Sequence, residues 1–353
     1  MNLPSRLSRL VDRIAPLDVT AGEAVQRHLD SLTKPPGSLG RLEEIAWRLA
    51  VLRGGRPRVE RPVLFTFAAD HGVVTEGVSA YPQSVTAQMV ENFVRGGAAV
   101  NVLANDAGAR VIVADFGIVN PVAPSAALVQ CRIGAGTANM ALAPAMSRDQ
   151  ALRAIQAGAA LAEEAIAEGA DLLGTGEMGI GNTTAASAIT AAVTGAPPAT
   201  VTGRGTGIDE GAWRRKVQVV ERALALNRPD GRDAVDVLTK VGGFEIGGLA
   251  GLMLVGAAER VPVIVDGFIS TAAALLAVTL APAAGSVLFA SHRSVEPGHA
   301  VALAHLGLVP YLDLSLRLGE GTGAALFIHL ARAAARIYAE MATFKAAGVD
   351  GPR

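Results

Sequence analysis

The chain contains few of the residues that mark several common classes of protein. Its 353 residues include a single cysteine, Cys131, which excludes a disulfide framework and a cysteine-rich zinc site. The formal net charge is −1 and the arginines are scattered, so the chain lacks the basic stripe of a nucleic-acid-binding protein. Only four lysines occur, and none stands in the Gly-Lys-Ser/Thr step of a P-loop. We therefore expect neither a nucleic-acid partner nor a P-loop nucleotide site.

Long apolar segments are also missing. The uncharged stretch 267–290 is long enough to raise the question of a membrane span, but Pro282 and Gly285 interrupt it. Its first half predicts a helix and its second half a buried strand. The first 18 residues alternate arginine with leucine and contain no continuous apolar core, so they do not resemble a secretory signal. These features predict a cytoplasmic protein without a membrane partner.

The residues that are abundant indicate a compact α/β enzyme. Half of the residues are apolar and only 4% are aromatic, with Ala, Leu, Val and Gly predominating. Short apolar runs alternate with helical patterns, which predicts a parallel sheet covered by helices on both faces. The predicted strands are 62–69, 110–115, 170–174, 262–266 and 286–291, with a possible last strand at 310–313. The predicted helices are 84–103, 147–169, 182–193, 209–226, 245–260 and 297–306.

The two ends of the chain differ from its middle. Residues 1–55 and 322–353 have helical patterns without strands, and we expect them to pack together as a smaller helical lobe. Residues 56–321 then form the parallel α/β catalytic domain. No internal repeat or long linker divides this middle segment.

Polar residues follow the predicted strands at the points where the strands end. Asp70, Asp115, Asp266 and Ser291 each stand at or just after such an end. Ligands of open parallel sheets bind outside the carboxyl ends of the strands. The sequence therefore predicts one site along this edge.

The segment 171–184 is the most informative part of that edge. Four glycines lie between Gly174 and Gly181, and Glu177 is the one carboxylate among them. Asn182 or Thr183 is predicted to cap the following helix, whose N-terminal N–H groups attract phosphate. This pattern predicts a phosphate subsite with an acidic side chain beside it.

The same segment formally matches the dinucleotide-binding fingerprint through Gly174, Gly176 and Gly179. That fingerprint requires an acidic residue about 20 positions further on. No acidic residue occurs between Glu177 and Asp209. A nicotinamide-dependent oxidoreductase therefore remains only an alternative interpretation.

Two further glycine-rich segments contribute candidate site residues. The first, 203–207, precedes a helix for which Asp209 is the predicted N-cap, and Arg204 and Lys216 would give cationic contacts to a phosphate monoester. The second surrounds Glu320 with glycines. Such a carboxylate either faces a ligand, with a pKa that its surroundings can raise or adjust, or belongs to a plain turn.

Together these segments resemble the nicotinate-nucleotide–dimethylbenzimidazole phosphoribosyltransferases of cobalamin nucleotide-loop assembly. The matching segments run in the family's order over nearly the whole chain, and they are 32–40, 68–74, 81–88, 176–184, 203–207, 265–271, 291–294 and 317–323. The resemblance implies a Rossmann-like parallel sheet with a small helical lobe, a homodimer and no cofactor. It also implies transfer of phosphoribose from nicotinate mononucleotide to 5,6-dimethylbenzimidazole, which gives α-ribazole 5′-phosphate and nicotinate.

The resemblance also implies roles for individual residues. Glu320 matches the general base. The benzimidazole is expected near Ser79, Tyr81, Gln88 and Leu318. The phosphoribosyl and nicotinate parts are expected near Glu177, Met178, Gly179, Ile180, Asn182, Gly205, Lys216, Asp266 and Ser291. A non-catalytic protein that binds a nucleotide or benzimidazole in the same cleft is the second alternative.

Overall fold

The chain folds around one parallel sheet. The computed structural model describes residues 3–120, 122–123 and 125–351. Its six strands are all parallel, in the order β3-β2-β1-β4-β5-β6. Their bounds are β1 Pro62–Ala69, β2 Arg110–Gly117, β3 Leu128–Gln130, β4 Leu172–Met178, β5 Val263–Val265 and β6 Leu288–Ala290. The predicted α/β class and Rossmann-like sheet are confirmed.

Two details of the strand prediction were wrong. The three-residue strand β3 was missed, because it is too short to give an apolar run. The predicted strand at 310–313 does not form, and Leu312 makes only an isolated parallel bridge to His292.

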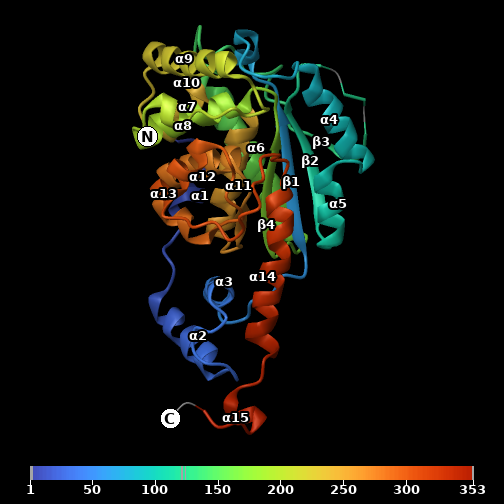
Figure 1. Ribbon diagram of the computed structural model, residues 1–353, viewed down its shortest axis with the longest axis vertical. Coiled ribbons are helices and arrows are strands. Elements are labelled where there is room, and N and C mark those ends of the chain that lie inside the picture. The colour runs from blue at the N-terminus through green and yellow to red at the C-terminus, as the bar shows by residue number, and fades with distance from the viewer. Residues whose placement is uncertain (1–2, 121, 124, 352–353) are drawn as a thin grey trace.

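Helices cover both faces of this sheet (Figure 1). On one face lie α6, α11 and α12, while α4, α5 and α14 lie on the other. The α-helices are α1 Ser5–Asp12, α2 Val19–Ser31, α3 Arg41–Leu52, α4 Ser84–Arg95, α5 Ala99–Asp106, α6 Arg148–Ala167, α7 Asn182–Thr194, α8 Pro198–Val201, α9 Glu210–Asn227, α10 Ala234–Val241, α11 Phe244–Ala258, α12 Phe268–Leu280, α13 Pro297–Leu306, α14 Thr322–Glu340 and α15 Phe344–Ala347; the 3₁₀ helices are η1 Gly72–Glu76 and η2 Pro282–Val287.

The single helix predicted over 84–103 is in fact two. Gly96 adopts a left-handed conformation, with φ +80°, and ends α4. A non-glycine residue adopts this conformation at a cost, so glycine marks the break. The chain then turns before α5 begins at Ala99.

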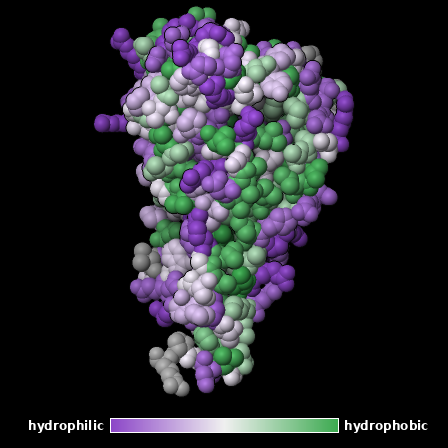
Figure 2. All heavy atoms as spheres, viewed as in Figure 1, coloured by the Kyte–Doolittle hydropathy of each residue, from purple (hydrophilic) through white to green (hydrophobic). Residues whose placement is uncertain are grey.

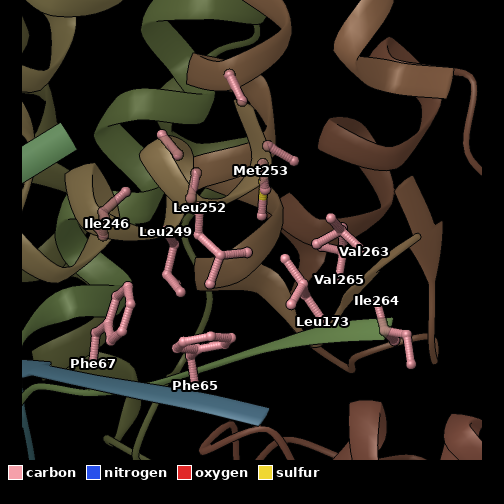
Figure 3. Close-up of a cluster of buried hydrophobic side chains, with 14 of the residues drawn as sticks. Phe65, Phe67, Leu173, Ile246, Leu249, Leu252, Met253, Val263, Ile264 and Val265 are labelled. Carbon is pink, nitrogen blue, oxygen red and sulfur yellow. The ribbon is translucent and has the colours of Figure 1, made fainter. Parts of the chain in front are cut away.

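The core is centred on α11, which beyond Glu245 in its first turn is apolar on all sides and is buried between the sheet and neighbouring helices. Phe65 and Phe67 of β1 point toward Leu249 and Leu252 of this helix (Figure 3). On its other side α11 crosses α6 very closely, because a Cβ at Gly158 would overlap the carbonyl oxygen of Gly248. A helix that is apolar all round is typical of such a buried position.

Below the sheet, α2 and α3 lie near the lower end of α14 and α15 (Figure 1). The His28 ring nitrogen Nε2 lies 2.9 Å from the Tyr338 carbonyl oxygen, and the Thr33 N–H donates to Ala342 O at 3.0 Å. Helix α3 packs along α14. Helix α1, in contrast, packs against α11 beside the sheet. The division into 56–321 and a lobe of 1–55 plus 322–353 stays a prediction, and residues 1, 2, 352 and 353 lie outside the described residues.

One face of the molecule carries a band of apolar residues. Figure 2 shows this band over α14 and α5, with hydrophilic residues along its margins. Val102 of α5 is 64% exposed. Across the described residues, each helix is either too short or too polar to cross a bilayer.

Candidate active site

The carboxyl edge of the sheet gathers most of the residues predicted to bind the phosphoribosyl group. Glu177 and Met178 end β4, while Asp266 and Ser291 directly follow β5 and β6. Adjacent parallel strands bring these ends to one edge, as predicted. Helices α7 and α14 both begin there as well.

The turn between β4 and α7 differs in one respect from its prediction. The N-cap of α7 is Gly181, with φ +95°, and no side chain caps this helix. Asn182 instead donates its side-chain amide to the Glu177 carboxylate. Thr183 Oγ1 accepts a hydrogen bond from Lys216 Nζ at 2.8 Å. The prediction of a side-chain cap was therefore wrong, because the Asn182 and Thr183 side chains bond Glu177 and Lys216 instead.

Lys216 is a buried cation beside this turn. Its side chain is fully buried, and in the described part of the chain it forms no ion pair with a carboxylate. A Cβ at Gly205 would lie 3.1 Å from Nζ, so the glycine loop 203–207 passes directly over the ammonium group. Burial lowers the pKa of Lys216 to about 8. An anion bound here would relieve this cost, which supports a phosphate subsite.

The loop over Lys216 is held by Glu296, which the sequence did not indicate. The Gly205 N–H donates to Glu296 Oε1 at 2.8 Å, and a Cβ at Gly203 would overlap Glu296 Oε2. The guanidinium of Arg204, a predicted phosphate contact, pairs with Glu210 at 2.6 Å. Lys216 stays the predicted phosphate cation beneath the loop.

A cavity of about 710 Å³ opens on the outer side of the same loop. Its lining combines the glycine loop with Trp213, Pro297 and Arg317. The volume suits a small molecule of nucleotide size. Gly205 and Glu296 line this cavity and also adjoin Lys216, so the cavity and the cationic subsite share a wall.

Three buried carboxyl groups lie at the other end of the site. Burial, together with the charges of Asp266 and Glu245, raises the pKa of Glu177 to about 8. Burial also raises the pKa of Asp266 to about 7 and that of Glu320 to about 7. Carboxyl groups that cannot all ionise together share protons at neutral pH. Such a cluster is typical of an active site.

Asp266 anchors the start of α14. Its two carboxylate oxygens accept from backbone N–H groups, of Gly321 at 3.2 Å and of Ala324 at 3.0 Å. Ser291 Oγ donates to the Asp266 carbonyl at 3.0 Å. Asp266 therefore fixes the residues that follow Glu320, a role that the sequence did not reveal.

Glu320 stands in a strained turn. Its φ is +66°, and Gly319 and Gly321 on either side have φ of +82° and +100°. A non-glycine residue in this conformation costs free energy and is found where the surrounding structure enforces it. Thr66 Oγ1 donates to the Glu320 carbonyl at 2.9 Å. The Glu320 carboxyl group is buried, and among the described residues its Oε2 atom has no hydrogen-bond partner.

These residues form one continuous arc of contacts. A Cβ at Gly319 would overlap Glu177 Oε1, so the Glu320 turn rests on the Glu177 carboxylate. Glu177 bonds Asn182, and the adjacent Thr183 bonds Lys216. The arc therefore joins the Glu320 turn to Lys216.

The residues expected around the benzimidazole lie at the surface. Tyr81 is 53% exposed and Leu318 is 58% exposed, and Gln88 is exposed on α4. The loop that carries Ser79 contacts the glycine loop 203–207, because Ala80 N donates to Thr206 Oγ1 at 3.0 Å. Two large apolar side chains left in solvent beside a polar site are consistent with a binding surface.

The remaining predicted residues belong to the turn itself. Met178 is partly exposed at the end of β4, and Gly179 lies where a Cβ would overlap the carbonyl oxygen of Ala69. The Ile180 N–H donates to Thr86 Oγ1 at 3.1 Å. Gly179 is thus required by the close approach of β1 to the turn.

Residues 14–349 match a family model described as phosphoribosyltransferase. The chain belongs to this family. It is 57% identical over 348 residues to a nicotinate-nucleotide–dimethylbenzimidazole phosphoribosyltransferase from Roseiflexus sp., covering 98% of this chain and 99% of the relative. A relative of the same name from Geobacter metallireducens is 53% identical, with coverage of 98% and 99%. The crystal structure of the Thermus thermophilus protein of this name superposes with a TM-score of 0.90 at 51% identity, covering 95% of this chain and 99% of that one.

The resemblance predicted from the sequence motifs is thereby confirmed. The protein is a pentosyltransferase of the nicotinate-nucleotide–dimethylbenzimidazole phosphoribosyltransferase family. This membership replaces the oxidoreductase interpretation of Gly174, Gly176 and Gly179. The roles of individual site residues stay predictions.

Proposed function

We propose that the protein transfers phosphoribose from nicotinate mononucleotide to 5,6-dimethylbenzimidazole in cobalamin lower-ligand synthesis. The products are α-ribazole 5′-phosphate and nicotinate. The names of the relatives support this choice of substrates. The observation that carries it is Glu320, whose buried carboxyl group has an unpartnered oxygen and a pKa raised to about 7.

The reaction needs a proton acceptor at the benzimidazole. One ring nitrogen attacks the anomeric carbon, and the bond from that carbon to the pyridinium nitrogen breaks. The electron pair of this bond neutralises the pyridinium, so nicotinate leaves without protonation. The other ring N–H of the benzimidazole becomes acidic as the new bond forms, and Glu320 takes this proton. General-base catalysis of this kind contributes about 10²–10⁴-fold.

The other residues bind and orient the donor. Lys216 receives the phosphate beneath the glycine loop 203–207. Glu177 receives a ribose hydroxyl, and Asn182 fixes the orientation of its carboxyl group. Attack from the face opposite the departing nicotinate inverts the anomeric carbon. Tyr81 and Leu318 offer apolar surface to the benzimidazole.

We further propose that the protein acts as a homodimer in the cytoplasm. The apolar band over α14 and α5 supports burial against a second copy, and the single cysteine suits a reducing compartment. Sedimentation of the purified protein is expected to give twice the mass of the chain.

The test of the reaction is direct. Purified protein is incubated with nicotinate mononucleotide and a panel of benzimidazoles, purines and phenols, and the products are identified by mass. We expect release of nicotinate and formation of α-ribazole 5′-phosphate with 5,6-dimethylbenzimidazole. Binding of both substrates without nicotinate release would support a non-catalytic binding protein instead.

A further inference from the structure

A buried pair formed by a histidine and a glutamate lies beneath the β4–α7 turn and takes no part in the chemistry proposed for Glu320. His71, which follows β1, places its Nε2 atom 2.6 Å from Glu245 Oε1 in the first turn of α11. Both side chains are buried, with exposed fractions of 1% and 0%. Loss of either partner from a pair buried this deeply lowers the stability of the fold, because the other polar group would be left buried without a hydrogen bond.

The histidine ring is wedged between two glycine turns. A Cβ at Gly179 would lie 3.3 Å from His71 Cδ2, and one at Gly181 would lie 3.4 Å from His71 Cβ. On the opposite side, a Cβ at Gly243 would overlap the ring and would lie 2.7 Å from Glu245 Oε2. The ring therefore fills the space between the phosphoribosyl turn and the start of α11, and Glu245 fixes its orientation.

We propose that His71 and Glu245 are positioning residues that hold the 179–181 turn, and with it Glu177 and the start of α7, in the geometry that binds nicotinate mononucleotide. The inference rests on the proposed function. Neither side chain needs to touch the substrate. Their effect passes through the turn to Asn182 and Thr183, which bond Glu177 and Lys216.

Two further observations favour positioning over a purely structural role. Within the described part of the chain, Glu245 Oε2 has no hydrogen-bond partner, so the carboxylate is held there through the oxygen that bonds His71. The charge of Glu245 is also among the causes that raise the pKa of Glu177, which places the pair within electrostatic range of that carboxyl group. A pair that served packing alone would not need to lie under the turn that carries the site.

The experiment compares donor and acceptor kinetics in conservative variants. Glu245→Gln and His71→Gln keep side chains of similar reach but remove the carboxylate or the imidazole, so that at most an amide hydrogen bond remains in place of the short pair. We expect KM and the directly measured Kd for nicotinate mononucleotide to rise about tenfold or more, with KM for dimethylbenzimidazole nearly unchanged. The matched control is Asp171→Asn, because Asp171 is equally buried but lies at the opposite edge of the sheet, where it accepts from Glu60 N and Arg61 N.

The outcomes distinguish failure of the positioning role from failure of the proposed function. Variants that melt earlier than wild type but bind nicotinate mononucleotide normally, as expected for Asp171→Asn, would overturn the positioning role. Wild-type protein that fails to bind nicotinate mononucleotide would instead overturn the proposed function. Hydrogen exchange of the unmodified protein gives a test that needs no variant. Added nicotinate mononucleotide should slow exchange at 179–183 and at 243–247 together, and protection of 179–183 alone would contradict the pair's role.

Discussion

Gly176 of β4 lies directly against the carbonyl oxygen of Glu320, so closely that a Cβ at this position would overlap it. Thr66, which is the β1 partner of Gly176 in the sheet, donates to the same carbonyl. Two neighbouring strands therefore hold the strained Glu320 turn from below. The sheet itself sets the position of the proposed base.

This contact predicts the effect of a single methyl group. Gly176→Ala should push the Glu320 turn away from the sheet and lower kcat/KM by about tenfold or more, because small displacements of reacting groups are costly. Gly285→Ala is the control, since a Cβ there meets only Val278 at an ordinary 3.7 Å. Steady-state kinetics that are equal for both variants would show that Gly176 does not constrain the base.

Lys216→Ala is expected to weaken donor binding selectively. The variant loses the buried ammonium that we assign to the phosphate, so KM for nicotinate mononucleotide should rise much more than KM for dimethylbenzimidazole. Lys240→Ala removes a lysine whose ion pair with Asp236 is partly exposed, and it should change neither constant. Equal increases in both Michaelis constants for Lys216→Ala would place this lysine outside the phosphate subsite.

Activity should rise with pH through about 7. Burial raises the pKa of Glu320 to about 7, and a general base acts only when ionised. Log kcat/KM for dimethylbenzimidazole should therefore increase by up to one unit per pH unit below 7 and level off above it. The residual activity of Glu320→Gln reports any titration of the substrate itself, and an identical profile in that variant would remove Glu320 as the source.

The stability of the folded protein should fall as pH rises, in contrast to its activity. The pKa of Glu177 is raised from its ordinary value of 4.5 to about 8, so its contribution to stability is fully present below 4.5 and is lost as pH rises through 8. Asp266, with a pKa of about 7, acts in the same sense. The melting temperature should thus fall between pH 5 and 9, and Glu177→Gln should flatten the fall. A melting temperature that increases over this range would contradict the cluster's electrostatics.

The sequence predicted those parts of the fold that depend on local patterns. Strand β1 was predicted at 62–69, as the structure has it, because its apolar run is long and bounded by Arg61 and Asp70. The helix predicted over 84–103 was split by Gly96, since apolar periodicity continues across the break and only the left-handed backbone reveals it. The meeting of the polar strand ends at one carboxyl edge also followed from the predicted parallel sheet, while ligand binding at this edge stays a prediction.

The contacts that position the site could not be predicted in the same way. The hydrogen bonds of Asp266 to Gly321 and Ala324 join residues more than fifty positions apart. The bond between Glu296 and the Gly205 N–H likewise depends on how β6 and α7 are placed by the sheet. The spacing of residues in the sequence does not indicate such pairs, so the residues that support this site are identified only from the tertiary structure.

Single-turnover kinetics of Glu320→Gln test whether Glu320 accepts the benzimidazole proton. The carboxamide keeps the shape of the side chain but cannot take a proton. We predict that the chemical step slows by about 10²-fold or more, while the Kd for nicotinate mononucleotide stays close to that of wild type. Near-normal single-turnover rates with 5,6-dimethylbenzimidazole would contradict the account and require another acceptor at the same edge of the sheet.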